Sequence, residues 1–245
     1  MKQVLLNKSH VQKLIHEGQE QPLATKNYPS RGQTAVQKLY QTEAGKLFFK
    51  QVSERNHRDC QIDVQSGTLA EREYWAFLLA KEIGLHVPEL ILLDEMTTVQ
   101  CWLPYPYAHQ YATYEGPLIY RARNIFHCAL FDWLTGQVDR HNANYLYDFT
   151  EQQIILIDSA HAFLKQDGGL PAYLEFFESI HPNELSKVQR TSVFSSIKKL
   201  TQKHIRSFVK LRDESEAQAL LTRHRQLMSV KSLADVIALY RGGGA

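Results

Sequence analysis

Strand patterns fill the first hundred residues of this chain, whereas helical patterns fill most of the rest. The alternating segments 35–41 and 46–52 flank a short turn at Gly45 and predict a β-hairpin. Segments 87–95 and 97–104 predict two more strands, and the last quarter of the sequence has a helical pattern. A run of strands followed by a run of helices is typical of α+β proteins, so we expect an α+β fold.

Three helices are expected outside the last quarter of the chain. Ser9 is predicted to cap a short helix that ends at Gly18. The apolar positions of residues 68–83 recur at helical spacing, and Gly84 follows as a C-cap. A third, amphipathic helix is predicted to begin near Tyr120 and to end at Gly136.

The remaining segments predict a loop, a hairpin and a division of the chain. The polar segment 53–67 is expected to be a loop, and residues 145–158 predict a hairpin with a five-residue polar connection. Two prolines in segment 103–109 mark the expected boundary. We therefore predict two lobes, a strand-rich one over 1–105 and a helical one over 106–245.

Polar side chains crowd together between the third helix and the second hairpin. They are Asp139, Arg140, His141, Asn142 and Asn144, and Asp158 follows the apolar run 154–157. Phosphoryl transfer needs one carboxylate near the acceptor hydroxyl, and a second carboxylate with an amide oxygen to hold Mg²⁺ on the nucleotide. A loop with this composition, followed by a strand and an acid, fits that requirement.

The quoted residues "TGQVDRHNANYLYD…IILIDSAHAF" resemble the catalytic segment of the atypical kinases related to HipA and to the phosphatidylinositol 3/4-kinases. The shared pattern is D-R-H-x-x-N, then a strand and I-D, and the similarity is greatest to small bacterial HipA-like kinases. Upstream, "GKLFFKQV" resembles their lysine-bearing strand, and "EYWAFLLAKEIGLHVPELILLD" is similar to their helix and following strand. The resemblance covers roughly residues 40 to 165 and implies a two-lobed, protein-kinase-like fold.

The resemblance also implies a role for individual residues. Asp139 would be the catalytic base, and Asn144 and Asp158 would bind Mg²⁺. Lys50 would contact the α- and β-phosphates of ATP and would pair with Glu73 on the following helix.

Several assignments have alternatives at this stage. Glu71 is the alternative partner for Lys50, because it and Glu73 point in different directions on a helix. Ser30 and Gly32 lie in the segment expected to cradle the phosphates, although it has a single glycine instead of G-x-G-x-x-G. Ser159 follows Asp158 where protein kinases have Phe-Gly, and no A-P-E signature follows, which argues against a phosphorylation-regulated activation loop.

Other residues near the polar loop and near the lobe boundary are also candidates for a role in the site. Arg140 either binds a phosphate or braces the loop through carboxylate contacts, and His141 is expected to organise the loop. The aromatic residues near the lobe boundary either line a purine site or belong to the core; they are Trp102, Tyr105 and Tyr107.

The expected activity is transfer of the γ-phosphoryl group from Mg-ATP to a hydroxyl acceptor, with a protein serine or threonine as the first choice. A lipid hydroxyl, AMP transfer and a nucleotide-binding module without turnover remain as alternatives. The formal net charge of +2 is too small to indicate nucleic acid as a partner. A basic stripe in the C-terminal helices is either a solvated face or a surface for an acidic partner or membrane.

The spacing of the cysteines and the length of the apolar segments indicate in which cellular compartment the protein is expected. Cys60, Cys101 and Cys128 show no paired spacing, and the histidines show no zinc-ligand spacing. No stretch approaches the length of a membrane span, and the first residues lack the apolar core of a secretory signal. These features favour a reduced, cytoplasmic setting, with an effector acting in a host cytosol as the alternative.

Overall fold

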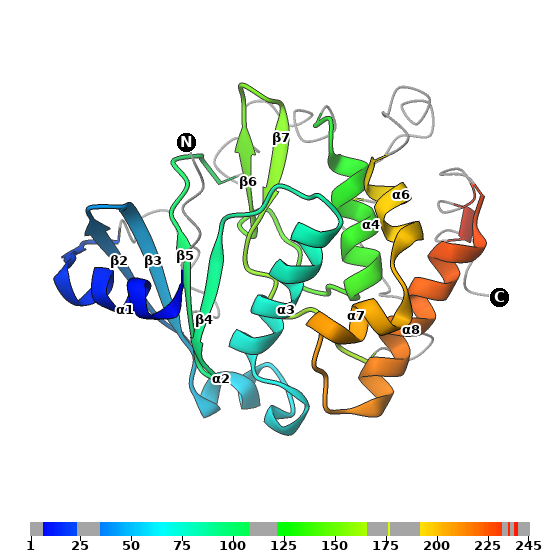
Figure 1. Ribbon diagram of the computed structural model, residues 1–245, viewed down its shortest axis with the longest axis horizontal. Helices are drawn as coiled ribbons and strands as arrows, with labels where there is room; N and C mark the ends of the chain where they lie inside the picture. The colour runs from blue at the N-terminus through cyan, green and yellow to red at the C-terminus, as the bar shows by residue number, and fades with distance from the viewer. Residues whose placement is uncertain are drawn as a thin grey trace.

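The computed structural model describes residues 7–23, 35–107, 122–165, 176, 192–231, 235 and 238–239. Ser30 and Gly32, expected to lie near the phosphates, fall outside the described residues. The described part confirms the α+β class: a sheet formed by the N-terminal part lies beside a group of helices formed by the C-terminal part (Figure 1).

The N-terminal sheet is antiparallel and has the strand order β1-β2-β3-β5-β4. Its strands are β1 (Gln19–Gln21), β2 (Val36–Thr42), β3 (Gly45–Gln51), β4 (Leu90–Asp94) and β5 (Thr97–Cys101). The predicted hairpin is confirmed as β2 and β3, and Gly45 has the positive φ of 113° that its tight turn requires. The two later strands are confirmed as β4 and β5.

Successive side chains of β3 face opposite sides of the sheet, as the pleat requires. Leu47 packs with Val11 and Leu14 of helix α1 (Lys8–Glu17) on one side. Phe48 and Lys50 face the other side, towards the helical lobe. Helix α1 begins two residues earlier than expected: the cap is not Ser9 but Asn7, whose side chain accepts a hydrogen bond from the His10 amide.

The expectation of a loop over 53–67 was wrong. Helix α2 (Glu54–Asp59) and the short 3₁₀ helix η2 (Val64–Ser66) occupy this segment. Ser53 and Asn56 form a capping box, in which each side chain bonds the backbone amide of the other residue. Capping of this kind stabilises a helix too short to show hydrophobic periodicity, which is why the pattern missed it.

Helix α3 (Leu69–Glu82) confirms the predicted central helix and lies between the sheet and the C-terminal helices (Figure 1). Thr68 and Glu71 form its capping box, and Gly84 follows its end with a φ of 80°. Leu69 and Ala70 pack in a cluster with Val52, which follows β3, whereas Leu79 and Ile83 belong to the main core. Both lobes therefore bury part of α3.

The described part of the C-terminal lobe contains several helices and one pair of strands. They are α4 (Ile125–Thr135), β6 (Tyr145–Asp148), β7 (Gln153–Leu156), α6 (Ser192–Lys199), α7 (Gln202–Phe208) and α8 (Glu214–Ser229). Helix α4 ends as predicted, with Gly136 in the left-handed conformation at a φ of 63°. The hairpin is confirmed with a four-residue connection, 149–152, one residue shorter than expected. Asp148 closes it by accepting hydrogen bonds from the Thr150 and Glu151 amides.

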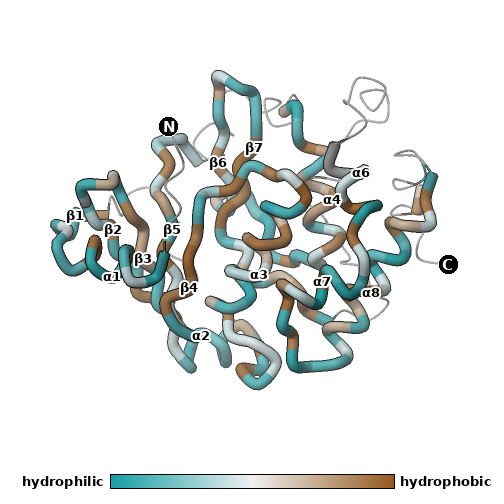
Figure 2. The backbone as a smooth tube through the Cα atoms, in the orientation of Figure 1, coloured by the Kyte–Doolittle hydropathy of each residue, from teal (hydrophilic) through white to brown (hydrophobic). Residues whose placement is uncertain are grey.

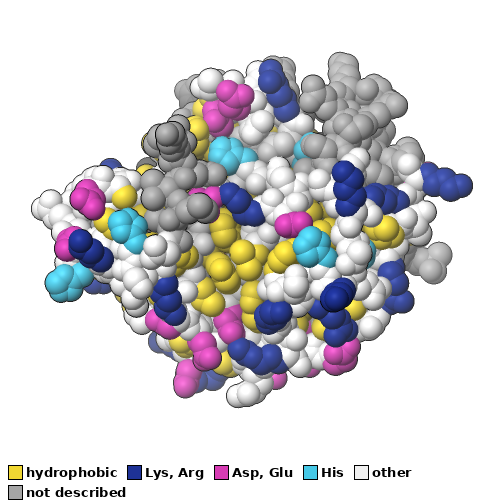
Figure 3. All heavy atoms as spheres, in the orientation of Figure 1, with side chains coloured by type: hydrophobic (Ala, Val, Ile, Leu, Met, Phe, Trp, Pro, Cys, Tyr) yellow, Lys and Arg dark blue, Asp and Glu magenta, His cyan; other side chains and the backbone are white. Residues whose placement is uncertain are grey.

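The largest hydrophobic core surrounds α4, and Figure 2 shows hydrophobic residues concentrated along β4 and in the interior around α4. Trp133 and Phe126 of α4 are almost completely buried. On the face shown in Figure 3, basic side chains are scattered over the surface of the C-terminal helices, with a few acidic ones among them. Within the described residues, no helix is long and apolar enough to cross a membrane. The division after residue 105 stays a prediction.

Candidate active site

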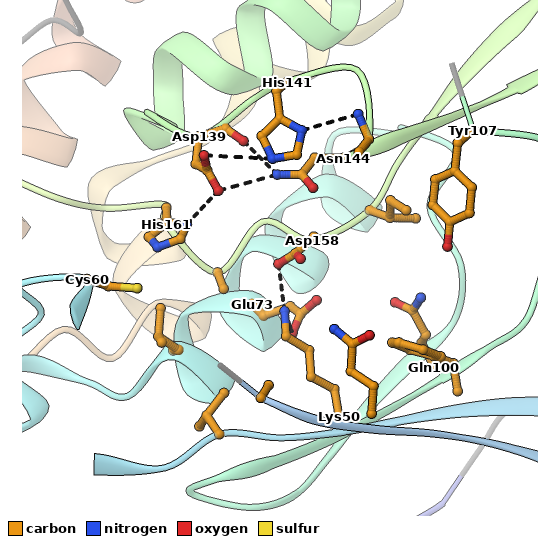
Figure 4. A pocket seen from close by; sticks show the side chains of 18 of the residues that line it. Lys50, Cys60, Glu73, Gln100, Tyr107, Asp139, His141, Asn144, Asp158 and His161 are labelled. Atoms are coloured by element: carbon orange, nitrogen blue, oxygen red, sulfur yellow. Dashed lines mark hydrogen bonds and ion pairs between the residues drawn. The ribbon is translucent and has the colours of Figure 1, made fainter. Parts of the chain in front are cut away.

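A cavity of about 340 Å³ lies between the sheet and the helical lobe. The sheet side contributes Lys50, and α3 contributes Glu73. The opposite wall contributes Asp139, Asn144 and Asp158 (Figure 4). All five residues that the sequence singled out within the described part therefore line one cavity, although they are far apart in the sequence.

Lys50 is at the centre of a buried charge cluster. Its Nζ lies 2.6 Å from Asp158 Oδ1 and 3.4 Å from Glu73 Oε2. The Thr98 hydroxyl of β5 donates to Glu73 Oε2 at 3.2 Å. The strand thus delivers the lysine, the helix delivers one carboxylate, and the segment after β7 delivers the other.

The pKa values of this cluster follow from burial and charge together. Burial alone would lower the pKa of Lys50, but the carboxylates of Asp158 and Glu73 outweigh it and raise the pKa above its usual range. Burial would raise the pKa of Asp158, yet the Lys50 ammonium holds it below its usual value. Burial raises the pKa of Glu73, and the Lys50 charge only partly opposes this. Lys50 is therefore a cation at neutral pH, and Asp158 is its principal anion.

Glu71, the alternative partner for Lys50, points elsewhere. Its carboxylate accepts two hydrogen bonds from the Arg212 guanidinium, at 2.6 and 3.1 Å, and one from the Thr68 amide at 2.9 Å. The structure thus assigns Glu73 to the lysine, and Glu71 to the helix cap and the C-terminal lobe.

The loop after α4 brings Asp139 and Asn144 together. The Asn144 Nδ2 donates to the Asp139 backbone carbonyl at 2.7 Å and lies 3.4 Å from Asp139 Oδ2. His141 Nδ1 accepts a hydrogen bond from the Ala143 amide at 3.2 Å, which agrees with the expectation that this ring organises the loop. The Asp139 side chain keeps 43% of its surface exposed, so a substrate can reach it.

Arg140 braces the loop, which decides between its two possible roles. Its guanidinium is 1% exposed and bonds the Asp132 carboxylate of α4 at 3.1 Å. It also donates to the carbonyls of Asn144 and Ile157, both at 2.8 Å, and to the Ser159 hydroxyl at 2.9 Å. One buried cation therefore connects α4, the loop and the segment that carries Asp158. Its guanidinium group is occupied by these contacts.

The donor set fits Mg²⁺. The nitrogen of the Asn144 side chain is turned towards Asp139, so the amide oxygen points away from it, on the side of Asp158 (Figure 4). Mg²⁺ prefers oxygen ligands, and in nucleotide sites it takes one or two from the protein and others from phosphates and water. The described residues contain no group of three His, Cys, Asp or Glu side chains arranged for a metal. The Asn144 amide and the Asp158 carboxylate offer oxygen atoms of the kind that Mg²⁺ prefers.

Some residues of the site could not be found from the motif. His161 Nδ1 lies 3.0 Å from Asp139 Oδ2 (Figure 4). Gln137 lies between the two acids, since its side chain accepts from the Asp139 amide at 3.3 Å and donates to the Asp158 carbonyl at 3.4 Å. Cys60, at the end of α2, also lines the cavity. The only available signal for His161 and Gln137 was their closeness in sequence to the acids.

The aromatic residues near the boundary divide between the two roles considered for them. Trp102 and Tyr107 line the cavity, and Trp102 lies against Phe48 with ring centroids 6.1 Å apart. Tyr105 lines a smaller neighbouring cavity and bonds Asp148. An aromatic wall suited to a flat base therefore involves Trp102 and Tyr107, but not Tyr105.

Comparison with known proteins defines the fold. No family model and no curated protein matches the sequence. Among solved structures, the Rio2 kinase from Chaetomium thermophilum, in a complex described as Rio2 kinase–ADP/Mg²⁺–phosphoaspartate, has a TM-score of 0.51 and 15% identity. The match covers 91% of this chain and 75% of that one. A Helicobacter pylori proinflammatory kinase, CtkA, has a TM-score of 0.49 and 12% identity, over 93% of this chain and 97% of that one. The chain has a two-lobed, kinase-like α+β fold.

Proposed function

We propose that this protein is a phosphotransferase that moves the γ-phosphoryl group of ATP to a hydroxyl acceptor. The observation that carries the proposal is the convergence of Lys50, Glu73, Asp139, Asn144 and Asp158 on one cavity between two lobes. Lys50, Glu73 and Asp158 come from separate segments of the chain. Asp139 and Asn144 share one loop. Chance placement of turn-forming acids would not bring them to a buried lysine on the opposite wall.

In the proposed reaction, the acceptor hydroxyl gives its proton to the Asp139 carboxylate while its oxygen bonds the γ-phosphorus. The bond between that phosphorus and the β,γ-bridging oxygen breaks, and ADP leaves with the bond's electrons. Lys50 neutralises phosphate charge, and Glu73 holds the lysine in place. Mg²⁺ bound by Asn144 and Asp158 would supply further charge neutralisation on the phosphates. The barrier is then lowered by positioning and electrostatics, without a covalent enzyme intermediate.

For the acceptor we propose a protein serine or threonine, on the strength of the sequence resemblance to HipA-like kinases. None of the contacts described in the cavity favours a lipid acceptor over a protein one. The experiment therefore compares the two kinds of acceptor: a Ser/Thr peptide panel and phosphatidylinositol vesicles are tested in parallel.

The test is phosphate transfer from labelled ATP by the purified chain with Mg²⁺, beside thermal unfolding with and without Mg-ATP. Asp139→Asn should reduce transfer by about 100-fold or more, because the proton acceptor is lost, while Mg-ATP still raises the unfolding midpoint. Asp158→Asn should abolish the Mg-ATP-dependent rise itself. Asp59→Asn, an exposed acid of α2, is the matched control and should change neither result.

Unchanged transfer by the Asp139 variant would contradict the assignment of the base. A midpoint that rises with Mg-ATP, without transfer to any acceptor, would show a nucleotide-binding module instead. Mass spectrometry of the labelled product separates phosphate transfer from AMP transfer.

A further inference from the structure

Arg72 is a completely buried cation outside the cavity. It precedes Glu73 on α3, has 0% exposed surface, and does not line the nucleotide cavity. Burying an arginine is costly unless its charge and its N–H groups are all matched by partners. The identity of those partners therefore shows what the residue holds together.

The partners of Arg72 come from three separate parts of the chain. Its Nη2 lies 2.6 Å from Glu216 Oε2 in the first turn of α8, and 2.9 Å from the Ser66 hydroxyl, which also bonds Glu216. Its Nε donates to the Gly67 carbonyl at 2.9 Å, just before α3. Its Nη1 donates to the Ala162 carbonyl at 3.2 Å.

The Ala162 contact connects Arg72 to the proposed metal site. Ala162 follows Asp158 by four residues, in a segment whose backbone is constrained at both ends. Asp158 has a φ of 48° and Phe163 a φ of 69°, both in the left-handed region that such residues rarely adopt. Neighbouring groups have to hold such a segment in place, and Arg72 is one of them, together with the Thr135 carbonyl that accepts from the Phe163 amide at 2.7 Å.

We propose that Arg72 and Glu216 are positioning residues for nucleotide binding. The ion pair fixes α3 and the segment after Asp158 relative to α8, and so keeps Glu73 and Asp158 beside Lys50. No described residue of α8 lines the cavity, yet the inference makes this helix necessary for Mg-ATP affinity. It rests on the proposed function, because Mg-ATP is taken as the ligand.

A second ion pair between α3 and the C-terminal lobe provides the control. Arg212 binds Glu71 at 2.6 Å, but its side chain is 48% exposed. The Glu71 side chain is only 9% exposed, but without Arg212 its carboxylate still accepts the hydrogen bond from the Thr68 amide, and water can reach the half-exposed place of the guanidinium. Loss of Arg212 should therefore have a small effect, whereas a buried cation that loses its anion has no substitute. Both pairs tie α3 to the start of α8, Glu216 in its first turn and Arg212 in the connection just before it, and they differ in the exposure of the partner outside α3.

The test compares Glu216→Gln with Arg212→Met in steady-state kinetics. Glu216→Gln should raise the KM for Mg-ATP about tenfold and change kcat less than about threefold, since Arg140 and Asp132 hold the Asp139 loop independently. Arg212→Met should leave KM within about twofold of wild type. An equal KM rise in both variants, or none in Glu216→Gln, would overturn the proposal.

A conservative variant separates positioning from folding. Glu216→Asp keeps the charge, and should restore KM to within about threefold of wild type if the ion pair is the cause. If Glu216→Gln does not fold, Ser66→Ala replaces it, because it removes one hydrogen bond from the same pair and keeps both charges. A KM unchanged by Ser66→Ala and not restored by Glu216→Asp would exclude the role.

Amide hydrogen exchange without nucleotide distinguishes this inference from the proposed function. Glu216→Gln should accelerate exchange in α3 and in residues 159–163, but not in β6 and β7. If the wild type neither binds nor turns over Mg-ATP, the proposed function fails while this measurement still decides the positioning role. Unchanged exchange in 159–163 would overturn that role alone.

Discussion

Asp139 lies between two imidazole rings, and their distances from its carboxylate differ. His161 Nδ1 is 3.0 Å from one carboxylate oxygen, whereas His141 Nε2 is 3.9 Å from the other. A carboxylate only accepts hydrogen bonds, so a hydrogen bond over this distance needs a proton on Nδ1 of His161. We therefore expect His161, and not the more distant His141, to orient the proposed base.

This difference predicts the effects of two substitutions. His161→Phe keeps a ring but removes the donor, and should lower kcat by about 10- to 100-fold because Asp139 loses its orientation. The KM for Mg-ATP should stay within about twofold, since His161 bonds none of the other site residues. His141→Asn keeps an acceptor for the Ala143 amide, and should retain most of the activity. Steady-state kinetics checks both, and equal losses of kcat would contradict the assignment.

At the residue scale, the sequence was sufficient to select residues that line one cavity where they follow one another in local order. Asp139, Asn144 and Asp158 were found because the loop, the strand and the final acid succeed one another along the chain. The sequence favoured Glu73 over Glu71 as the partner of Lys50, and the structure confirms that pairing, which depends on the helix face that meets the sheet. Asp132 as the partner of Arg140 was equally hidden, since an acid within an apolar helix gives no sign of what it contacts.

The N-terminus of α3 is held by a histidine from α2. His57 has 0% exposed surface; its Nδ1 donates to the Ser53 carbonyl at 2.8 Å and its Nε2 accepts from the Leu69 amide at 3.0 Å. The ring must be neutral to accept at Nε2. Burial lowers the pKa of His57, the nearby Arg72 charge lowers it further, and only the Ser53 hydrogen bond and the Glu54 charge oppose this.

The sign of the resulting pH dependence is determined by that lowered pKa. Between the folded and unfolded pKa values the unfolded chain binds more protons, so stability falls as pH drops below about 6.5, by at most about 1.4 kcal/mol per pH unit. His57→Gln should be less stable than wild type at pH 7.5, and the difference between the two should shrink at pH 5.5. Urea unfolding at both values measures this, and a difference independent of pH would contradict it.

Element boundaries were predictable where glycines or long periodic segments mark them. Gly45, Gly84 and Gly136 all adopt positive φ at the expected ends of elements. At Gly136 an added Cβ would lie 2.7 Å from the Arg223 guanidinium carbon, so packing as well as backbone conformation excludes other residues. Helix α2 was missed because six residues carry too little periodicity, and the Ser53–Asn56 pair was its only signal.

On the scale of the whole molecule, the main core extends across the expected boundary. It joins Trp75 and Leu79 of α3 to Trp133 of α4 and Leu220 of α8. The first turn of α3 packs in a second cluster with Val52, the residue after β3. The two lobes therefore share buried surface through this helix.

Shared burial predicts one cooperative unfolding transition. In urea, tryptophan fluorescence and far-UV circular dichroism should give coincident midpoints, because Trp75 and Trp133 report the shared core while the helices and sheet report the backbone. A Trp102→Phe variant, which removes the tryptophan of the cavity wall, serves as a control for a local change in signal. Two separated transitions would show that the sheet unfolds independently of α3.

The two-lobed order was predictable from the succession of strands and helices, because each has its own period. The sequence did not predict that both lobes would pack against α3. A helix buried on several sides lacks the single apolar stripe that would indicate one neighbour. The ion pairs of this helix, Arg72–Glu216 and Glu71–Arg212, join residues more than a hundred positions apart, and no sequence pattern marks them.

One consequence of the shared helix concerns how a ligand enters. The two walls of the cavity are joined by α3. The lobes therefore cannot open about a hinge unless this helix separates from one of its two hydrophobic clusters. Among the described residues that line the cavity, Asp139 and His141 keep about half of their side-chain surface exposed. We therefore expect ligand entry and release to involve rotations of such side chains more than a hinge motion between the two lobes.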